Sequence, residues 1–372
     1  MYKNESKSTE ANRWKGVLET AVNKRIGSAA NVIETVKNQM IEDFIVQGKK
    51  LQFHATHDEK SDTLATVVME LPNEAERCLH TNAIQQLASK TNVPKKFIDS
   101  LLGSGHWGAE LIAHNFNEIL HNSNGSKYLI RSIGNETRAF LSDRYRRIDS
   151  RPLVDAFAAE SQNFGLQPFE GFALDTTIRI RGIIPVIFEP YPGEFIAFGL
   201  QWKNSDFGVG GHELGFYSLR PVCLNGAVGE SVLRQVHLGS RLQDDIEYSA
   251  ETYRLDTMAN ISALRDVVRA ALNPANIDLQ CEVIRTAHEK KINPKEAKEM
   301  LQARLTRSDA DEVIEAYTSA DIEMMPAGNS VYRLSNALSW VANLKRDSEP
   351  EKSLELQQFA GEIMPKVKLL NA

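Results

Sequence analysis

Arginine and tyrosine side chains gather between Lys127 and Arg151, where they could contact a phosphate backbone. This segment has seven cationic and three acidic residues, a balance of +4 in a chain whose formal charge is -6. The cations are Lys127, Arg131, Arg138, Arg144, Arg146, Arg147 and Arg151, and the acids are Glu136, Asp143 and Asp149. Guanidinium groups match phosphate oxygens, and tyrosine rings stack on exposed bases. The segment therefore predicts a site for single-stranded nucleic acid.

The predicted site extends to two later stretches. Arg179 and Arg181 share one face of a predicted strand because they are two residues apart. Lys203-Asn204 adds a cation and an amide before a glycine-rich loop. The predicted nucleic-acid contacts are Arg131, Arg138, Arg144, Tyr145, Arg146, Arg147, Arg179, Arg181, Lys203 and Asn204. The first candidates among them are Arg144, Arg146 and Arg147.

The same segment has an alternative, structural interpretation. Glu136, Asp143 and Asp149 could pair with the arginines in a rigid network of turns. The two interpretations differ in one observable property, which is whether the arginines face an open groove or lie buried in ion pairs.

Two motifs that resemble catalytic sites have simpler explanations. The loop 207–212, FGVGGH, could bring backbone N–H groups to a phosphate, but it lacks the lysine and Ser/Thr of a P-loop. A hairpin connection or bulge explains it better.

Cys223 could act as a thiol nucleophile with His212 or His237 as its base. Because Val222 and Leu224 flank it, Cys223 is better explained as a small buried hydrophobic residue.

Two polar clusters could hold a metal ion, and neither predicts one. His54 and His57, with Asp58 and Glu59 beside them, would need a third ligand such as His80 or His106 from elsewhere in the chain. The acidic run Asp244, Asp245 and Glu247 is typical of a solvated surface. We therefore predict no catalytic residue, no metal and no cofactor. The hypothesis of an enzyme that acts on nucleic acid or nucleotides stays open, but the sequence identifies no set of catalytic residues for it.

Composition places the chain among ordinary globular proteins. It has 372 residues, of which 42% are hydrophobic and 25% charged, and its pI is near 5.9. This balance excludes a protein coated in basic surface, so nucleic acid would need a local basic patch. Three widely spaced cysteines indicate reduced thiols. With no long apolar run, we expect a cytoplasmic protein that makes no membrane contact.

The pattern of apolar residues predicts an α+β fold, with a central, mostly antiparallel sheet, flanking helices and an all-helical C-terminal region. We expect three regions, 1–125, 126–240 and 241–372. The first has helices broken near Gly27-Ser28, a hairpin formed by 51–56 and 63–71, two short helices within 82–102, and a helix over 106–121. The second has strands around Gly134-Asn135, a helix from Asp149 or Ser150, one strand over 172–188 and another over 194–205. A last strand ends at Asn225-Gly226, before a helix that carries Arg234 and His237.

The third region is predicted to be helical throughout. Its helices are expected at 249–271, 276–290, 294–305, 309–319, 328–346 and 350–362, with breaks at Asn273-Pro274, Asn293-Pro294 and 326–328. Such a region could pack against the sheet or mediate homo-oligomerisation.

Several motifs in this order resemble a family of phage- and plasmid-borne proteins classified only as a domain of unknown function, the nine-three-two family. They are QLASKTNVPKKFIDSLL, RAFLSDRYRRIDSRPLV, GLQWKNSDFGVGG, RPVCLNGAV followed by His237-Leu238-Gly239, and YRLSNALSWVAN. Asp206 departs from the pattern, in which we would expect glutamate. The resemblance covers roughly residues 83–343 and implies a mobile-element origin in a host cell. It implies no reaction.

Two hypotheses for function follow. The first is a DNA-transaction protein that binds single-stranded nucleic acid through a basic sheet face, for strand annealing or recombination, and that forms a homo-oligomer. The second is an interaction protein that inhibits or redirects a host nuclease or defence complex. In that case the acidic stretch 296–324 could bind a basic host surface.

Overall fold

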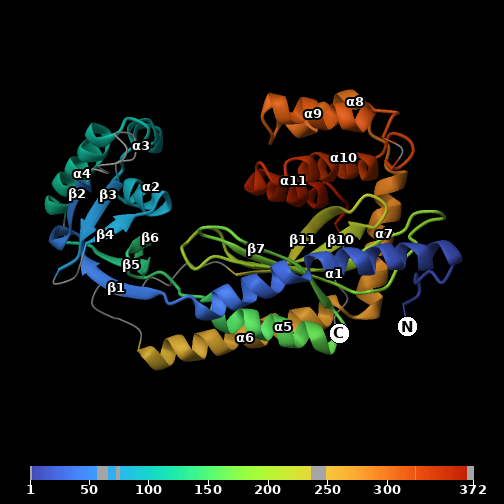
Figure 1. Ribbon diagram of the computed structural model, residues 1–372, viewed down its shortest axis with the longest axis horizontal. Helices are drawn as coiled ribbons and strands as arrows, with labels where there is room; N and C mark the ends of the chain where they lie inside the picture. Colours follow the sequence, from blue (N-terminus) through green and yellow to red (C-terminus); the bar gives the residue numbers. More distant parts are fainter. Residues whose placement is uncertain are drawn as a thin grey trace.

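The predicted α+β class is confirmed by the computed structural model, which describes residues 2–56, 66–72, 76–123, 125–235, 249–322 and 324–366. Within these residues the chain forms two β-sheets and eleven α-helices. Figure 1 shows two lobes, each built around one of the sheets. We call them the first lobe and the second lobe.

The first lobe contains a six-stranded sheet in the order β1-β5-β6-β4-β3-β2. Neighbouring strands are antiparallel, except that β4 and β6 are parallel. The strands are β1 (Glu42–Gln47), β2 (Gln52–Thr56), β3 (Thr66–Glu70), β4 (Arg77–Leu79), β5 (Lys127–Ile133) and β6 (Glu136–Ser142). One face packs against α2 (Thr81–Lys90), α3 (Lys95–Leu102) and α4 (His106–His121). Phe53, Phe116 and Phe140 lie in this core.

The second lobe contains a five-stranded antiparallel sheet in the order β11-β10-β9-β8-β7. Its strands are β7 (Gln167–Ala173), β8 (Ile178–Ile183), β9 (Ala197–Asn204), β10 (His212–Arg220) and β11 (Asn225–Gln235). Leu18 and Val22 of α1 (Thr9–Asn38) pack against Phe169 and Tyr217. A second, larger core includes Trp202 and residues of α5 (Ser150–Asn163) and α6 (Ala250–Ala271). The first lobe is therefore an insertion, because its strands and helices lie between α1 and α5 in the sequence.

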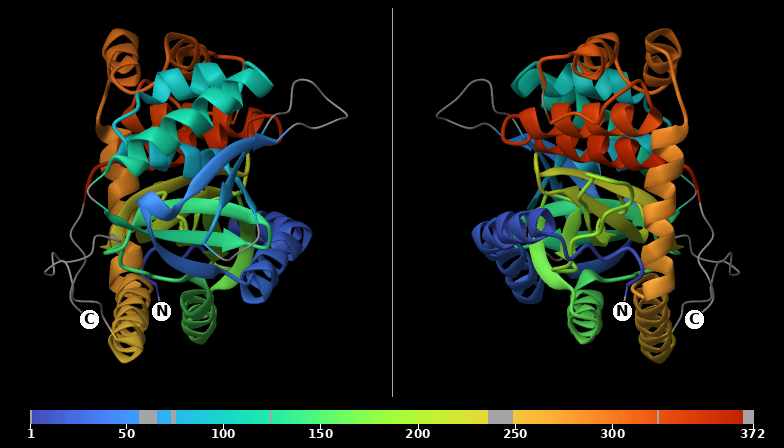
Figure 2. Two further views of the ribbon diagram at one scale, coloured as in Figure 1. Left: turned by 90° about the vertical axis from the view of Figure 1, so that its left-hand side faces the viewer. Right: turned by 90° about the vertical axis from the view of Figure 1, so that its right-hand side faces the viewer.

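Five further helices follow α6 in the described residues: α7 (Pro274–Glu289), α8 (Pro294–Gln302), α9 (Arg307–Thr318), α10 (Val331–Leu344) and α11 (Pro350–Glu362). In Figure 2, α10 and α11 lie across the second sheet from α5 and α6, whereas α7 runs upright beside the sheet. Helices α8 and α9 pack against each other, and α9 packs on α10. Polar N-caps begin α7 to α10, and Asn293 forms a capping box with Glu296. Together with α6 they confirm the helices predicted from the sequence. Helix α11 lies so close to β11 that a Cβ on Gly361 would collide with the carbonyl of Val228.

Three local predictions were wrong. Helix α1 is continuous through Gly27-Ser28. Residues 172–188 are not one strand, because Leu174–Thr177 form a turn between β7 and β8. Asn225 begins β11 rather than ending the last strand, so Arg234 lies on a strand, whereas His237 is outside the described residues. Helix α1 continues through Gly27-Ser28 because it packs along β7, which is distant in sequence. The other two errors are local hairpins that the sequence reading did not separate, β7 with β8 and β10 with β11.

The predicted regions also divide differently in space. Strands β5 and β6 pair with strands from residues 42–79, so the predicted boundary at 125/126 falls within the first sheet. Region 1–125 contributes to both lobes, through α1 and through β1 to β4. The boundary at 240/241 lies outside the described residues.

Gly27→Ala tests whether α1 is one continuous helix packed on β7. Gly27 is exposed, and a Cβ there would meet no atom within 4 Å, so we expect a gain of about 0.5–1 kcal/mol in the free energy of unfolding. Gly171→Ala on β7 is the matched substitution. Its Cβ would lie 2.8 Å from Ala29 Cα, so we expect a loss of about 1–3 kcal/mol. Urea denaturation measures both, and a destabilising Gly27→Ala would contradict the continuous helix.

Candidate functional site

A buried guanidinium lies where the two lobes meet. Arg131 on β5 is 1% exposed and donates from Nε to Asp43 Oδ1 (2.7 Å), from Nη2 to Asp149 Oδ1 (2.7 Å), and from Nη1 to the Asp206 carbonyl (2.8 Å). Burial alone would lower the pKa of Arg131, but Asp149 and Asp43 more than offset burial and raise the pKa above its usual value. We call these four residues the Arg131 junction. It joins β5 and β1 of the first lobe to the α5 N-terminus and the β9–β10 loop of the second.

Asp206 is the most buried of the three aspartates at the junction. Asp206 is 3% exposed, and its Oδ1 accepts a hydrogen bond from the Ser150 backbone N–H at the start of α5 (2.7 Å). Burial, together with the nearby charge of Asp149, raises the pKa of Asp206 to about 6, although Arg131 and the Ser150 N–H act in the opposite direction. Asp206 therefore titrates in a range where most carboxyl groups are already ionised.

The other arginines of the segment also face carboxylates. Arg146 forms two hydrogen bonds with Asp256 on α6, from Nε to Oδ2 (2.7 Å) and from Nη2 to Oδ1 (2.5 Å). Arg147 Nε lies 3.3 Å from Asp43 Oδ2, and its guanidinium stacks over the Tyr253 ring. Arg138 donates to Glu136 (2.7 Å) and to the Asp175 carbonyl (3.0 Å). Arg144 and Tyr145 are half-buried, and burial raises the pKa of Tyr145.

The predicted contacts on β8 and β9 lie inside the second lobe. Arg181 is 1% exposed and donates to Glu170 Oε2 (3.0 Å) and Gln201 Oε1 (2.8 Å). Lys203 Nζ lies 3.7 Å from Glu213, and burial lowers its pKa. The Asn204 amide donates to the Ile148 carbonyl (2.7 Å) and the Ser150 hydroxyl (2.9 Å). The two hydrogen bonds of Asn204 link the second sheet to the start of α5.

Arg179 is a buried arginine that forms no ion pair with the described residues. It is 8% exposed, and its Nε and Nη1 atoms have no hydrogen-bond partner among the described residues. Burial and then the adjacent Arg181 lower the pKa of Arg179 to about 10, although Glu213, Glu355 and Glu351 act in the opposite direction. A buried guanidinium with unused N–H groups is a candidate anion contact.

The ten predicted contacts therefore do not form one open basic surface. Arg131 and Arg147 share Asp43, and Arg146 is tied to α6. Arg179 and Arg181 are buried on the second sheet, and Lys203 is half-buried beside them. The sequence left two alternatives, arginines that face an open groove or arginines paired with carboxylates. Pairing with carboxylates is observed for Arg131, Arg138, Arg146, Arg147 and Arg181. Sequence analysis missed Asp43 and Asp256 because they lie 88 and 110 residues from Arg131 and Arg146. It missed Glu170 because the β7–β8 hairpin was not predicted.

The remaining motifs do not form a catalytic constellation within the described residues. Cys223 lies in the turn between β10 and β11, where burial raises the pKa of its thiol. His212, at the other end of β10, contacts Gln235 (3.2 Å). His54 lies 3.5 Å from Glu70 and 3.5 Å from Glu76, a surface group with metal-ligand chemistry. His57, Asp58, Glu59, His237, Asp244, Asp245 and Glu247 lie outside the described residues.

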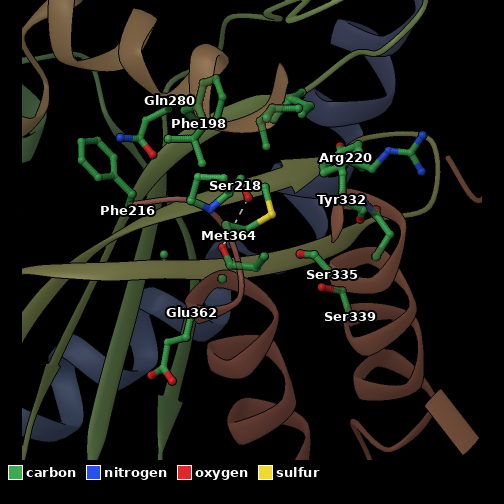
Figure 3. A pocket seen from close by; sticks show the side chains of 18 of the residues that line it. Phe198, Phe216, Ser218, Arg220, Gln280, Tyr332, Ser335, Ser339, Glu362 and Met364 are labelled. Carbon is green, nitrogen blue, oxygen red and sulfur yellow. Dashed lines mark hydrogen bonds between the residues drawn. The ribbon is translucent and has the colours of Figure 1, made fainter. Parts of the chain in front are cut away.

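A cavity of about 380 Å³ lies between the second sheet and helices α7, α10 and α11. One wall is formed by Phe198 and Phe216, which are diagonal neighbours on β9 and β10. Figure 3 shows Gln280 beside these rings and Ser335 and Ser339 on the other side. The sequence gives no signal for this cavity, because its lining residues are up to 170 residues apart (Ile196 to Lys366).

A hydrogen-bond network closes one end of the cavity. Glu194 accepts hydrogen bonds from Arg220 Nε (2.5 Å), Arg220 Nη2 (2.8 Å) and the Tyr332 hydroxyl (2.6 Å). Burial and then Glu194 raise the pKa of Tyr332 well above its usual value. Burial would lower the pKa of Arg220, but Tyr332 and Glu194 more than offset burial and raise it.

Comparison with known proteins adds no relative. No protein-family model, no curated protein and no solved structure matches this chain. The resemblance to the nine-three-two family therefore stays a prediction. In the described part of the chain, every helix is too short or too polar to cross a membrane.

Asp206→Asn tests the electrostatics of the Arg131 junction. Because the pKa of Asp206 is raised, the folded state binds a proton more tightly than the unfolded state does. This contribution to stability is present below the unfolded pKa of about 4 and is lost as the pH rises through about 6. We therefore expect Asp206→Asn to gain roughly 2–3 kcal/mol relative to the native protein between pH 4 and pH 8.

Urea denaturation across this pH range measures the difference. Asp99→Asn on α3, where the aspartate is exposed, is the control and should stay parallel to the native protein. Parallel curves for Asp206→Asn as well would show that the Asp206 carboxyl group has an ordinary pKa.

Proposed function

We propose that this protein is an interaction module that binds a basic surface of a partner protein. The observation that carries the proposal is the pairing of Arg131, Arg138, Arg146, Arg147 and Arg181 with carboxylates of the same chain. A phosphate backbone would have to displace these carboxylates. Removing one partner of a buried ion pair costs several kcal/mol, roughly 3–5, so the exchange is unfavourable at the buried arginines Arg131 and Arg181.

The surface that fits a basic partner is an open groove of about 610 Å³ between the β7–β8 turn and the start of α11. Its lining has four carboxylates, from Asp175, Glu349, Glu351 and Glu355, and one cation, Lys352. Lys352 forms an ion pair with Asp309 (2.7 Å), outside the groove lining. We call this the acidic groove. Glu351 and Glu355 are exposed on one face of α11, one helical turn apart.

The chemistry of the acidic groove indicates the class of partner. Proteins that act on nucleic acids present basic patches of lysine and arginine. An acidic groove on a chain of net charge -6 would be attracted to such a patch. A host nuclease, or a nucleic-acid-binding component of a defence complex, is the partner that we propose. Binding would block the surface that the partner uses for its substrate.

Binding of a short oligolysine peptide, measured by calorimetry at low and at physiological salt, tests the acidic groove. We expect Glu351→Gln/Glu355→Gln to weaken binding by about tenfold, because two exposed contacts of about 0.5–1 kcal/mol each are lost. The control is Glu299→Gln/Glu315→Gln, which removes the same charge from exposed positions on α8 and α9. Equal weakening by both variants would mean attraction to overall charge only, and absence of binding would refute the proposal.

A second candidate function is the binding of single-stranded nucleic acid, for strand annealing or recombination. One observation favours it, which is the unused N–H groups of Arg179 beside Lys203, its partner in the β8–β9 register. A phosphate group would satisfy them. Homo-oligomerisation through the helical region would belong to this function.

Fluorescence anisotropy with labelled single-stranded and duplex oligonucleotides across a salt series tests this candidate. If Arg179 contacts phosphate, Arg179→Met should weaken binding and reduce the salt slope by about one ion. Arg307→Met on the exposed surface of α9 is the control. If Arg179 has no ligand, Arg179→Met should leave binding unchanged and be neutral or stabilising in urea, because it removes an uncompensated buried charge.

A further inference from the structure

The cavity in the second lobe has the walls of a binding site for a flat ring. Phe198 and Phe216 project from one face of the sheet, and Ile284 of α7 completes the apolar part. Phe198 and Phe216 are 1% and 5% exposed, so their rings are held in place by packing. A volume of about 380 Å³ is within the range of sites that bury small molecules.

Polar groups without a partner in the chain face the same space. The Ser339 hydroxyl lines the cavity, is buried at 2% exposure, and forms no recorded hydrogen bond with another described residue. The Gln280 amide has none either, and Figure 3 shows it beside Phe198 and Phe216. Ser335 uses its proton on the Ala360 carbonyl, which leaves its oxygen as an acceptor. Gln280 is half-buried and Ser339 is 2% exposed, so both groups are available to hydrogen-bond a ligand that enters the cavity.

The charged residues of the cavity already have partners, which excludes a charged ligand. Arg220 is paired with Glu194 and also donates to the Met324 carbonyl. Glu362 is paired with Arg304, and Lys366 has a partner in the chain as well. A ligand with a phosphate or carboxylate group would therefore meet no free cation among the described lining residues. The ligand that fits is neutral.

The Gln280 amide offers a donor and an acceptor side by side. This arrangement matches the edge of an adenine ring, where an amino group lies next to a ring nitrogen. The hydroxyl groups of Ser335 and Ser339 on the opposite side can bind ribose hydroxyls. We propose that the cavity binds a small neutral ring compound with a hydrogen-bonding edge, a purine base or its nucleoside. This binding is independent of the acidic groove.

Calorimetric titration of the full chain with adenine, adenosine and adenosine monophosphate tests the proposal. We expect adenosine to bind with a stoichiometry of one and to raise the melting temperature. Gln280→Leu, which keeps the size of the side chain but removes its amide, should weaken adenosine binding by about tenfold or more. Ser339→Ala should weaken it less, because one hydroxyl contact is lost.

Gln302→Leu on α8 is the matched control, because Gln302 is exposed and distant from the cavity lining. It should bind adenosine as the native protein does. Three results would overturn the proposal: no saturable binding of adenine or adenosine to the native protein, equal binding to Gln280→Leu and the native protein, or tenfold tighter binding of the monophosphate than of adenosine.

Discussion

The arrangement of the two lobes depends on the burial of one positive charge. Arg131 cannot lose its proton, so its guanidinium needs carboxylates and carbonyls wherever it is buried. Asp43 comes from its own sheet, whereas Asp149 and the Asp206 carbonyl come from the second lobe. Asp206 also accepts a hydrogen bond from the first backbone N–H of α5. The junction therefore orients a sheet, a loop and a helix through one side chain.

Apolar contacts of Phe207 also hold the two lobes together, in addition to the ion pair between Arg131 and Asp149. Phe207 packs with Leu129, Ala139 and Leu141 on the face of the first sheet that α2 to α4 leave uncovered. Its carbonyl accepts hydrogen bonds from Gln86 (2.8 Å) and Asn82 (3.1 Å) of α2. Because charge pairing, apolar packing and hydrogen bonds coincide at one loop, relative motion of the lobes would break all three together.

Local patterns predicted the elements well and their partners poorly. The helix 106–121 and the hairpin at Gly134 follow from spacing and turn chemistry alone. Leu129 and Arg131 are two residues apart on β5 and share one face of the first sheet. Phe207 and Asp206, more than 70 residues later in the sequence, cover that face. The periodicity of apolar residues in a strand does not show which distant residues will cover it. The cavity was missed for the same reason, because Phe216, Gln280 and Ser339 meet only after three separate elements have packed.

The insertion of the first lobe between α1 and α5 has a consequence for synthesis of the chain. Helix α1 is made before the first lobe, but its partner strand β7 follows more than 120 residues later, after the whole of the first lobe (Asn38 to Gln167). The first lobe is continuous from β1 to β6 and has a core of its own, so it can fold before β7 is available to pack against α1. During that interval the apolar stripe of α1, with Leu18 and Val22, has no sheet to cover it. The exposed lysines and glutamates on its other face then keep the nascent helix soluble.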